Sequence, residues 1–167
     1  RILANFQESY GGMSTLAHEL GHAYHNWCLA DRTPLQRQTP MTLAETASTF
    51  CQIIVRNAAL EHAAPEEQLA IIEADLQDNT QVIVDISSRF LFETEVFARR
   101  QSRELSSDEF CSIMTESQLA TYGEGLDSDA LHPFMWAVKP HYYSSAFYNF
   151  PYMFGLLFAL GVYARYR

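Results

Sequence analysis

The sequence predicts an all-α fold with a short N-terminal strand. Apolar residues recur at helical spacing through most of the 167 residues, and helix-capping signals open several of these segments. The one strand-like run is residues 2–6 (ILANF), followed by a turn over residues 9–12. Hydrophobic residues make up 48% of the chain, and neither a repeat nor a linker divides it, so we expect one globular domain over residues 1–167.

Charge and cysteine content narrow the function classes. The net charge of −9 disfavours nucleic acid and anionic membranes as partners, because both bind basic surfaces. The longest apolar run, residues 152–164, is too short to cross a bilayer. Cys28, Cys51 and Cys111 are odd in number and widely spaced, which favours reduced thiols in a cytoplasmic protein. The chain begins without Met or a signal peptide, so we expect a piece of a longer protein.

The first two helices are predicted on either side of a proline-containing loop. The first spans residues 13–29, and the loop follows over residues 31–41. Thr42 fits the N-cap of the second helix with Glu45 at position N3, the pattern of a capping box. This helix should run to about His62.

A long helical segment and two further helices complete the chain. Residues 66–103 form one rod or two pieces, with residues 78–80 as the expected break. Ser106 with Glu109 is a second capping box, and the last helix starts near residue 146. Pro151 lies near the first turn of that helix or kinks it. The rod should turn an apolar stripe inward, formed by Leu69, Ile72, Leu76, Val82, Ile86, Phe90 and Phe97.

Residues 18–22 (HELGH) form a His-Glu-x-x-His motif within the first helix. His18 and His22 are one turn apart, so both imidazoles share a helix face and can bind one Zn²⁺. Glu19 is placed to take a proton from a metal-bound water as general base. The alternative is a pair of solvated histidines on a polar surface. The apolar residues around the motif argue against that alternative, because they place the histidines in or beside a core.

A hydrolytic zinc site needs a third protein ligand, and His25 and Glu45 are the candidates. His25 lies about 10.5 Å along the helix axis from His18, too far to share one ion, so we expect it to line the site or support a ligand. Glu45 follows a loop that allows an antiparallel return, and two histidines with one glutamate form a known hydrolytic set. The capping box explains Glu45 equally well without a metal.

The order of motifs resembles the thimet oligopeptidase/oligoendopeptidase F family of zinc metallopeptidases. The similar segments are residues 2–6 (ILANF), 18–25 (HELGHAYH) and 42–48 (TLAETAS), and residues 141–152 (HYYSSAFYNFPY) resemble the oligoendopeptidase F branch. The resemblance implies Glu45 as third ligand, one Zn²⁺, a mainly helical catalytic domain and endopeptidase action on oligopeptides. It also implies an upstream lobe that this chain lacks, and an opening strand that offers an edge to an extended substrate.

The aromatic C-terminal segment has a functional and a structural interpretation. Tyr hydroxyls and a protonated His can donate to the oxyanion of a tetrahedral intermediate, whereas aromatics alone form a core wall. Family members use a His and tyrosines on such a loop, which implies His141 and Tyr148 as donors and Tyr143 and Tyr152 as substrate contacts. The sequence departs from the family in a shorter spacing after His141 and in Phe150, where many relatives have tyrosine.

Two rival functions share these residues. A zinc exopeptidase could use the same ligand set, and a helical fragment could bind zinc or peptide without turnover. The intact Glu19 argues against loss of catalysis.

Overall fold

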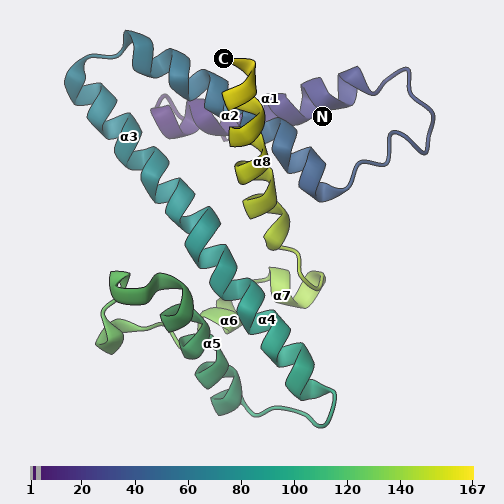
Figure 1. Cartoon of the computed structure of the whole chain (residues 1–167), viewed down its shortest axis with the longest axis vertical. Coiled ribbons are helices and arrows are strands. Elements are labelled where there is room, and N and C mark those ends of the chain that lie inside the picture. The colour runs from purple at the N-terminus through teal and green to yellow at the C-terminus, as the bar shows by residue number, and fades with distance from the viewer. Residues whose placement is uncertain (1, 3–4) are drawn as a thin grey trace. The chain divides into compact units, whose positions relative to one another are not determined.

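The computed structural model describes residues 2 and 5–167, and the all-α prediction is confirmed. Every regular element among these residues is a helix (Figure 1). The predicted N-terminal strand falls on residues 2–6, of which residues 3 and 4 lie outside the described part of the chain, and residues 5–7 have no regular structure. The elements are α1 (Tyr10–Cys28), α2 (Met41–His62), α3 (Pro65–Thr80), the π-helix η1 (Gln81–Asp85), α4 (Ile86–Arg100), α5 (Ser107–Tyr122), the 3₁₀-helices η2 (Gly123–Gly125) and η3 (Ser128–Ala130), α6 (Met135–Val138), α7 (His141–Ser144) and α8 (Phe150–Tyr166).

The chain divides into two compact units. The first contains residues 1–78 and 154–167, and the second contains residues 79–153. None of the described helices is both long enough and apolar enough to span a bilayer. The description of the whole chain as one catalytic-domain fragment stays a prediction.

In the first unit, α1 and α2 pack side by side (Figure 1). Ser9 caps α1 by accepting a hydrogen bond from the backbone N–H of Gly12 at 3.1 Å, so the helix begins within the predicted turn. Gly21 lies where the two helices touch. A Cβ at this position would be 2.6 Å from the Ser48 Cα, so only glycine permits this approach.

The start of α2 differs from the prediction. Its N-cap is Pro40, and the predicted capping box of Thr42 and Glu45 is wrong, because the helix begins at Met41 without a side-chain cap. The extended backbone of Pro40 leads directly into the helix, and its carbonyl accepts from Leu43 and Ala44. The Glu45 side chain is therefore not used at the helix start.

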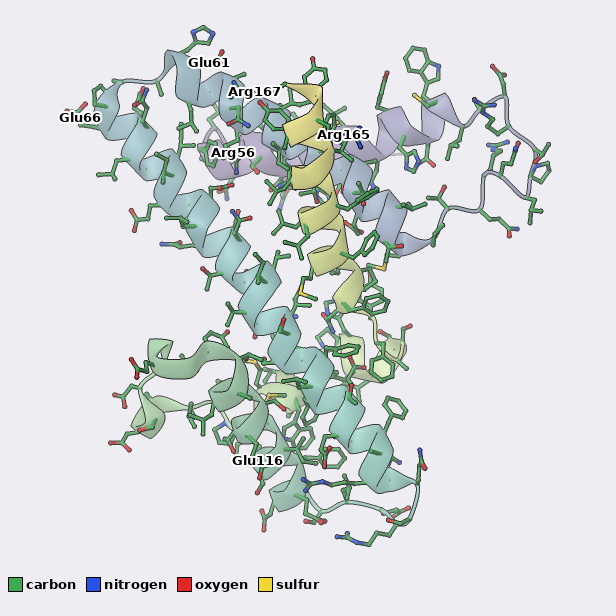
Figure 2. The ribbon with its side chains drawn as sticks, in the orientation of Figure 1. Arg56, Glu61, Glu66, Glu116, Arg165 and Arg167 are labelled. Carbon is green, nitrogen blue, oxygen red and sulfur yellow. The ribbon has the colours of Figure 1, made fainter. Side chains whose placement is uncertain are left out.

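Polar and aromatic contacts secure the remaining helices of the first unit. Arg56 of α2 pairs with Asp75 of α3 at 2.6 Å, and Arg167 lies 3.2 Å from Glu61 at the chain end (Figure 2). The ring of Phe50 contacts aromatic residues near the end of α8. These contacts join the chain's last helix to α2.

The rod does not break at residues 78–80. Instead α3 passes directly into the π-helix η1, which leads into α4. The predicted inward stripe is wrong in five of its seven positions, because these side chains are between 42% and 69% exposed: Leu69, Ile72, Leu76, Phe90 and Phe97. The residues of α4 that turn inward include polar side chains whose hydrogen-bond partners lie outside α4, and an apolar pattern cannot show them: Ile86, Ser88, Arg89, Phe92, Glu93 and Val96.

The second unit has a core between α4 and α5. Its centre is Phe92, Val96, Ile113 and Met114. The capping box of Ser106 and Glu109 is confirmed at the start of α5. The last helix starts at Phe150, later than predicted, with Pro151 in its first turn where a missing N–H is tolerated.

Candidate metal centre

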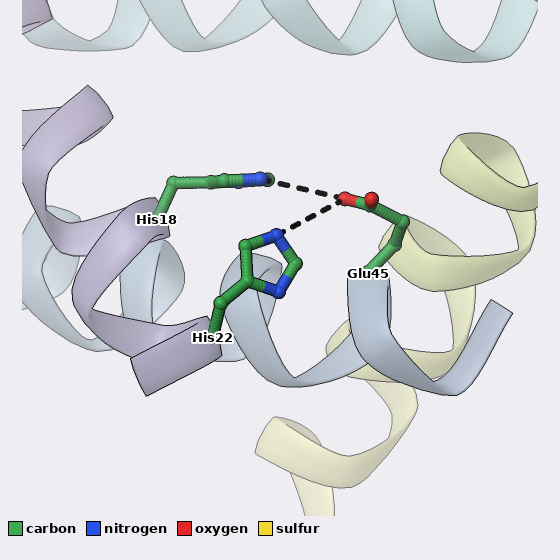
Figure 3. Close-up of side chains that lie close together, drawn as sticks. All are labelled: His18, His22 and Glu45. Carbon is green, nitrogen blue, oxygen red and sulfur yellow. Dashed lines mark ion pairs between the residues drawn. The ribbon is translucent and has the colours of Figure 1, made fainter. Parts of the chain in front are cut away.

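Three potential metal ligands converge between α1 and α2. The Nε2 atoms of His18 and His22 lie 3.4 and 3.9 Å from Oε2 of Glu45, and the ligand atoms are all within 4.8 Å of one another (Figure 3). Both histidines come from one face of α1, and Glu45 reaches them from the first turns of α2. The helix spacing of the motif and the close packing at Gly21 together produce this convergence.

The cluster has the dimensions and donor types of a tetrahedral zinc site. Zinc binds imidazole nitrogen and carboxylate oxygen at about 2.0–2.2 Å, so two ligands at a tetrahedral angle are separated by about 3.3 Å. The separation of 3.4 Å matches this edge, whereas 3.9 Å and the overall limit of 4.8 Å exceed it, so the side chains would draw together around a bound ion. Three protein ligands leave one tetrahedral position for water or substrate, as in hydrolytic sites.

Glu45 is a buried carboxylate in unusual surroundings. The residue is only 7% exposed, and among the described residues its ion-pair partners are His18 and His22 alone. The hydroxyl of Ser48 lies 3.4 Å from the same Oε2 atom. On the other side Gly155 of α8 packs so closely that an added Cβ would be 2.8 Å from the Glu45 Cβ. A buried carboxylate with no Lys or Arg partner is well suited to binding a cation.

Both ring nitrogens of His18 have a partner on α2. Its Nδ1 lies 2.8 Å from Oε1 of Gln52 on α2. Burial lowers the pKa of His18, and hydrogen bonds with Glu45 and Gln52 raise it. The negative charges of Glu45 and Glu19 act in the same direction, so the net effect raises the pKa above its usual value.

Glu19 and His25 lie on α1, the helix that also carries His18 and His22. Glu19 is half-buried, and its charge is near enough to affect the pKa of His18. Within the described part of the chain, the His25 ring forms no hydrogen bond, and it lines a largely apolar cavity of about 390 Å³ with Tyr24, Cys51 and other residues. Its supporting role stays a prediction.

The predicted tail residues gather in the second unit. The ring of His141 stacks on that of Tyr148 with centroids 4.7 Å apart, and Tyr148 contacts Tyr152 at 6.1 Å. Nδ1 of His141 lies 3.1 Å from Oδ1 of Asn149, which is only 2% exposed. Tyr143 is mostly exposed and donates its hydroxyl to the Trp136 carbonyl at 3.2 Å.

A buried polar network fixes this group. Arg89 donates to Oδ1 of Asn149 at 3.1 Å and pairs with Asp85 at the end of the π-helix. Because Oδ1 of Asn149 accepts from Arg89, it can also accept from the Nδ1–H of His141, which leaves Nε2 as the free ring nitrogen.

The loop between His141 and Tyr148 is also held in place. Phe147 has φ = 53°, a conformation that side chains larger than glycine rarely adopt. Its N–H donates to Glu93 at 2.8 Å, and its ring stacks on Phe97. Burial raises the pKa of Glu93, and the hydrogen bond from Phe147 opposes that rise. A strained backbone that is so firmly held is typical of functional loops.

Comparison with known proteins settles the family. Residues 1–167 match peptidase family M3 over their full length. The chain belongs to peptidase family M3. Within it the chain belongs to the oligoendopeptidase F branch, as the resemblance of the sequence motifs predicted.

The M3 chain is similar to three bacterial proteins in particular. It is 29% identical to "Oligoendopeptidase F, chromosomal" of Lactococcus lactis subsp. cremoris, over 92% of this chain and 26% of that protein. It is 29% identical to an oligoendopeptidase F homolog of Borreliella burgdorferi, over 97% of this chain and 28% of the relative. It is 25% identical to "Group B oligopeptidase PepB" of Streptococcus agalactiae, over 92% of this chain and 26% of that protein. No solved structure gave a significant match.

The M3 chain thus spans about a quarter of the length of the curated relatives it matches.

The sequence predicted each residue of the metal cluster but not the groups that support it. Gln52 follows Glu45 by two helical turns and therefore lies on the same face of α2, a spacing that could have revealed it. Arg89 and Asn149 are far apart in sequence, and no local pattern connects them.

Proposed function

We propose that this M3 chain carries the catalytic centre of a zinc metalloendopeptidase that hydrolyses oligopeptides. His18, His22 and Glu45 hold one Zn²⁺ in this proposal. The observation that carries it is the convergence of two imidazole nitrogens and a buried carboxylate oxygen within 4.8 Å. Membership of peptidase family M3 and the names of the relatives support peptide substrates.

The residues of the chain supply the proton transfers of hydrolysis. Bound zinc would polarise the peptide carbonyl and lower the pKa of water toward ~7. Glu19 accepts a proton from the attacking water while the oxygen of that water bonds to the carbonyl carbon of the peptide. Glu19 then passes that proton to the amine nitrogen as the C–N bond breaks, so the products are a carboxylic acid and an amine.

We assign the tail residues to the transition state and to the substrate. His141 and Tyr148 donate hydrogen bonds to the oxyanion, and Tyr143 and Tyr152 contact the peptide. The hydrogen bond of His141 Nδ1 to buried Asn149 supports this assignment, because it fixes the ring, and in the protonated imidazole the Nε2–H is then the donor that remains for the oxyanion. The stacking of His141 on Tyr148 restrains the second donor.

The test is cleavage of a fluorogenic peptide blocked at both ends, because an exopeptidase cannot cut it. The assay uses the longest natural protein that contains this chain. We expect Glu19→Gln to keep zinc but to lose at least about 100-fold in kcat, the lower range for general acid–base catalysis. The matched control is Glu66→Gln, an exposed glutamate at the start of α3 (Figure 2).

Three results would count against the proposal. Cleavage by Glu19→Gln at the rate of the Glu66→Gln control would remove Glu19 from its role. Peptide cleavage that continues after treatment with a zinc chelator would show that the reaction does not need zinc. Cutting of unblocked but not of blocked peptides would favour the exopeptidase alternative.

A further inference from the structure

Gln52 connects the metal cluster to a residue one helical turn before His18. Its Oε1 lies 2.8 Å from Nδ1 of His18, and its Nε2 donates to the hydroxyl oxygen of Ser14 at 3.0 Å. Ser14 and His18 are on α1, whereas Gln52 is on α2, and all three side chains are partly buried. A single amide thus bridges the two helices that carry the ligands.

The two ends of the Gln52 amide have different partners in the structure. The NH₂ group of Gln52 is directed at the Ser14 hydroxyl, so the carbonyl oxygen is directed at the imidazole. A carbonyl oxygen only accepts hydrogen bonds. The nitrogen that faces it, Nδ1 of His18, must therefore carry the ring proton.

Two acceptors compete for that single proton on a neutral His18. Gln52 lies 2.8 Å from Nδ1, and Oε2 of Glu45 lies 3.4 Å from Nε2. A proton on Nε2 would bond to the carboxylate and occupy the lone pair that a metal needs. The shorter distance favours Gln52, so Nε2 stays free.

We infer that Gln52, oriented by Ser14, is a positioning residue that keeps the proton of His18 on Nδ1 and leaves Nε2 free to bind zinc. The inference rests on the proposed zinc function. A neutral amide also does this without adding a further negative charge beside Glu45 and Glu19. In the described part of the chain the only polar contact of the His22 ring is its 3.9 Å ion pair with Glu45, so Gln52 fixes the proton of only one of the two histidine ligands.

The test compares four variants by zinc affinity, each made in the longest natural protein that contains this chain and measured in competition with a chromophoric chelator. Gln52→Leu removes the acceptor and should weaken zinc binding about 10–100-fold, the usual effect of losing such a partner. Gln52→Glu keeps an oxygen at Nδ1 and should bind zinc more tightly than Gln52→Leu. Ser14→Ala should cause a smaller loss, since the amide can then turn. Gln77→Leu, an exposed glutamine on α3, should leave affinity unchanged.

A second measurement reads the ring proton without any metal. Long-range ¹H–¹⁵N spectra of the same protein without metal, at a pH where the imidazoles are neutral, should show His18 with its proton on Nδ1. In Gln52→Leu the proton should move to Nε2, whereas the signals of His22 should not change. A role in folding alone would not move the tautomer, and thermal unfolding of each metal-free variant shows whether it is folded.

The outcomes separate this inference from the proposed function. If the wild type binds zinc and Gln52→Leu binds it equally tightly, the inference fails and the zinc site stands. A wild-type His18 with its proton on Nε2 would also overturn the inference. If the wild type binds no zinc, both fail. Should Gln52→Leu not fold, weaker zinc binding and a mixed tautomer in Ser14→Ala support the inference, and no change in either overturns it.

Discussion

Replacing Gly155 by alanine tests whether the last helix sets the position of the third ligand. The new Cβ would lie 2.8 Å from the Cβ and 3.0 Å from the carbonyl carbon of Glu45. Carbon atoms pack best at about 3.5–4.0 Å, so α8 or Glu45 must move by roughly 0.7–1.2 Å. Overpacking of this kind costs about 1–3 kcal/mol.

Gly161→Ala in the same helix is the matched control. A Cβ at position 161 meets no atom within 4 Å, so this variant shows the helix-propensity gain of alanine over glycine alone, about 0.5–1 kcal/mol. Gly155→Ala receives the same gain but also the packing cost. The difference between the two variants in free energy of unfolding is therefore about 1–3 kcal/mol, or roughly 2–12 °C in Tm for a chain of this size.

The assay measures thermal unfolding and zinc affinity for both variants. Metal sites tolerate changes of about 0.2 Å in ligand distance, so a shift of Glu45 by several tenths of an ångström should weaken zinc binding in Gly155→Ala only. Equal gains in Tm and equal zinc affinities for the two variants would refute the close contact between α8 and Glu45.

Three further predictions address packing, acid stability and the metal. Gly21→Ala should cost about 1–3 kcal/mol in urea unfolding, because its Cβ would lie 2.6 Å from the backbone of α2. Gly11→Ala, which meets nothing closer than 3.9 Å, should not destabilise the chain. Hydrogen bonds, first from Arg103 and then within the helix cap, lower the pKa of Glu109 to about 2. Its stabilising effect is therefore full above pH ~4.5 and is lost as the pH falls toward 2, and Glu109→Gln should flatten that part of the stability profile. Zinc at about 100 times its Kd should raise the unfolding free energy by about 2.7 kcal/mol, and neither a chelator-treated sample nor Glu45→Gln should show the gain.

The metal ligands could be predicted because their chemistry follows local spacing. His18 and His22 are one turn apart on a helix, and the helix is set by its own sequence. Glu45 was harder to predict as a ligand, because position N3 of a capping box explains a glutamate there equally well. The structure separates the two interpretations physically, since Pro40 starts α2 without help and the carboxylate is used elsewhere.

The interior of α4 shows why other features could not be predicted. The sequence suggested that apolar side chains such as Phe97 turn inward, but Arg89 and Glu93 are buried instead, at 5% exposure each. Arg89 is stabilised by partners that lie in η1 and just before α8, so its burial depends on contacts that form only after folding. A pattern along one helix does not contain that information.

The contact of Gly155 with Glu45 joins residues separated by 155 − 45 = 110 positions. A ribosome that has made α1 and α2 has already produced all three ligands, yet the side of Glu45 that α8 covers is still open. Zinc affinity should therefore rise in a second step when α8 docks during synthesis, and a chain truncated before residue 154 would carry a complete but loosely held set of ligands.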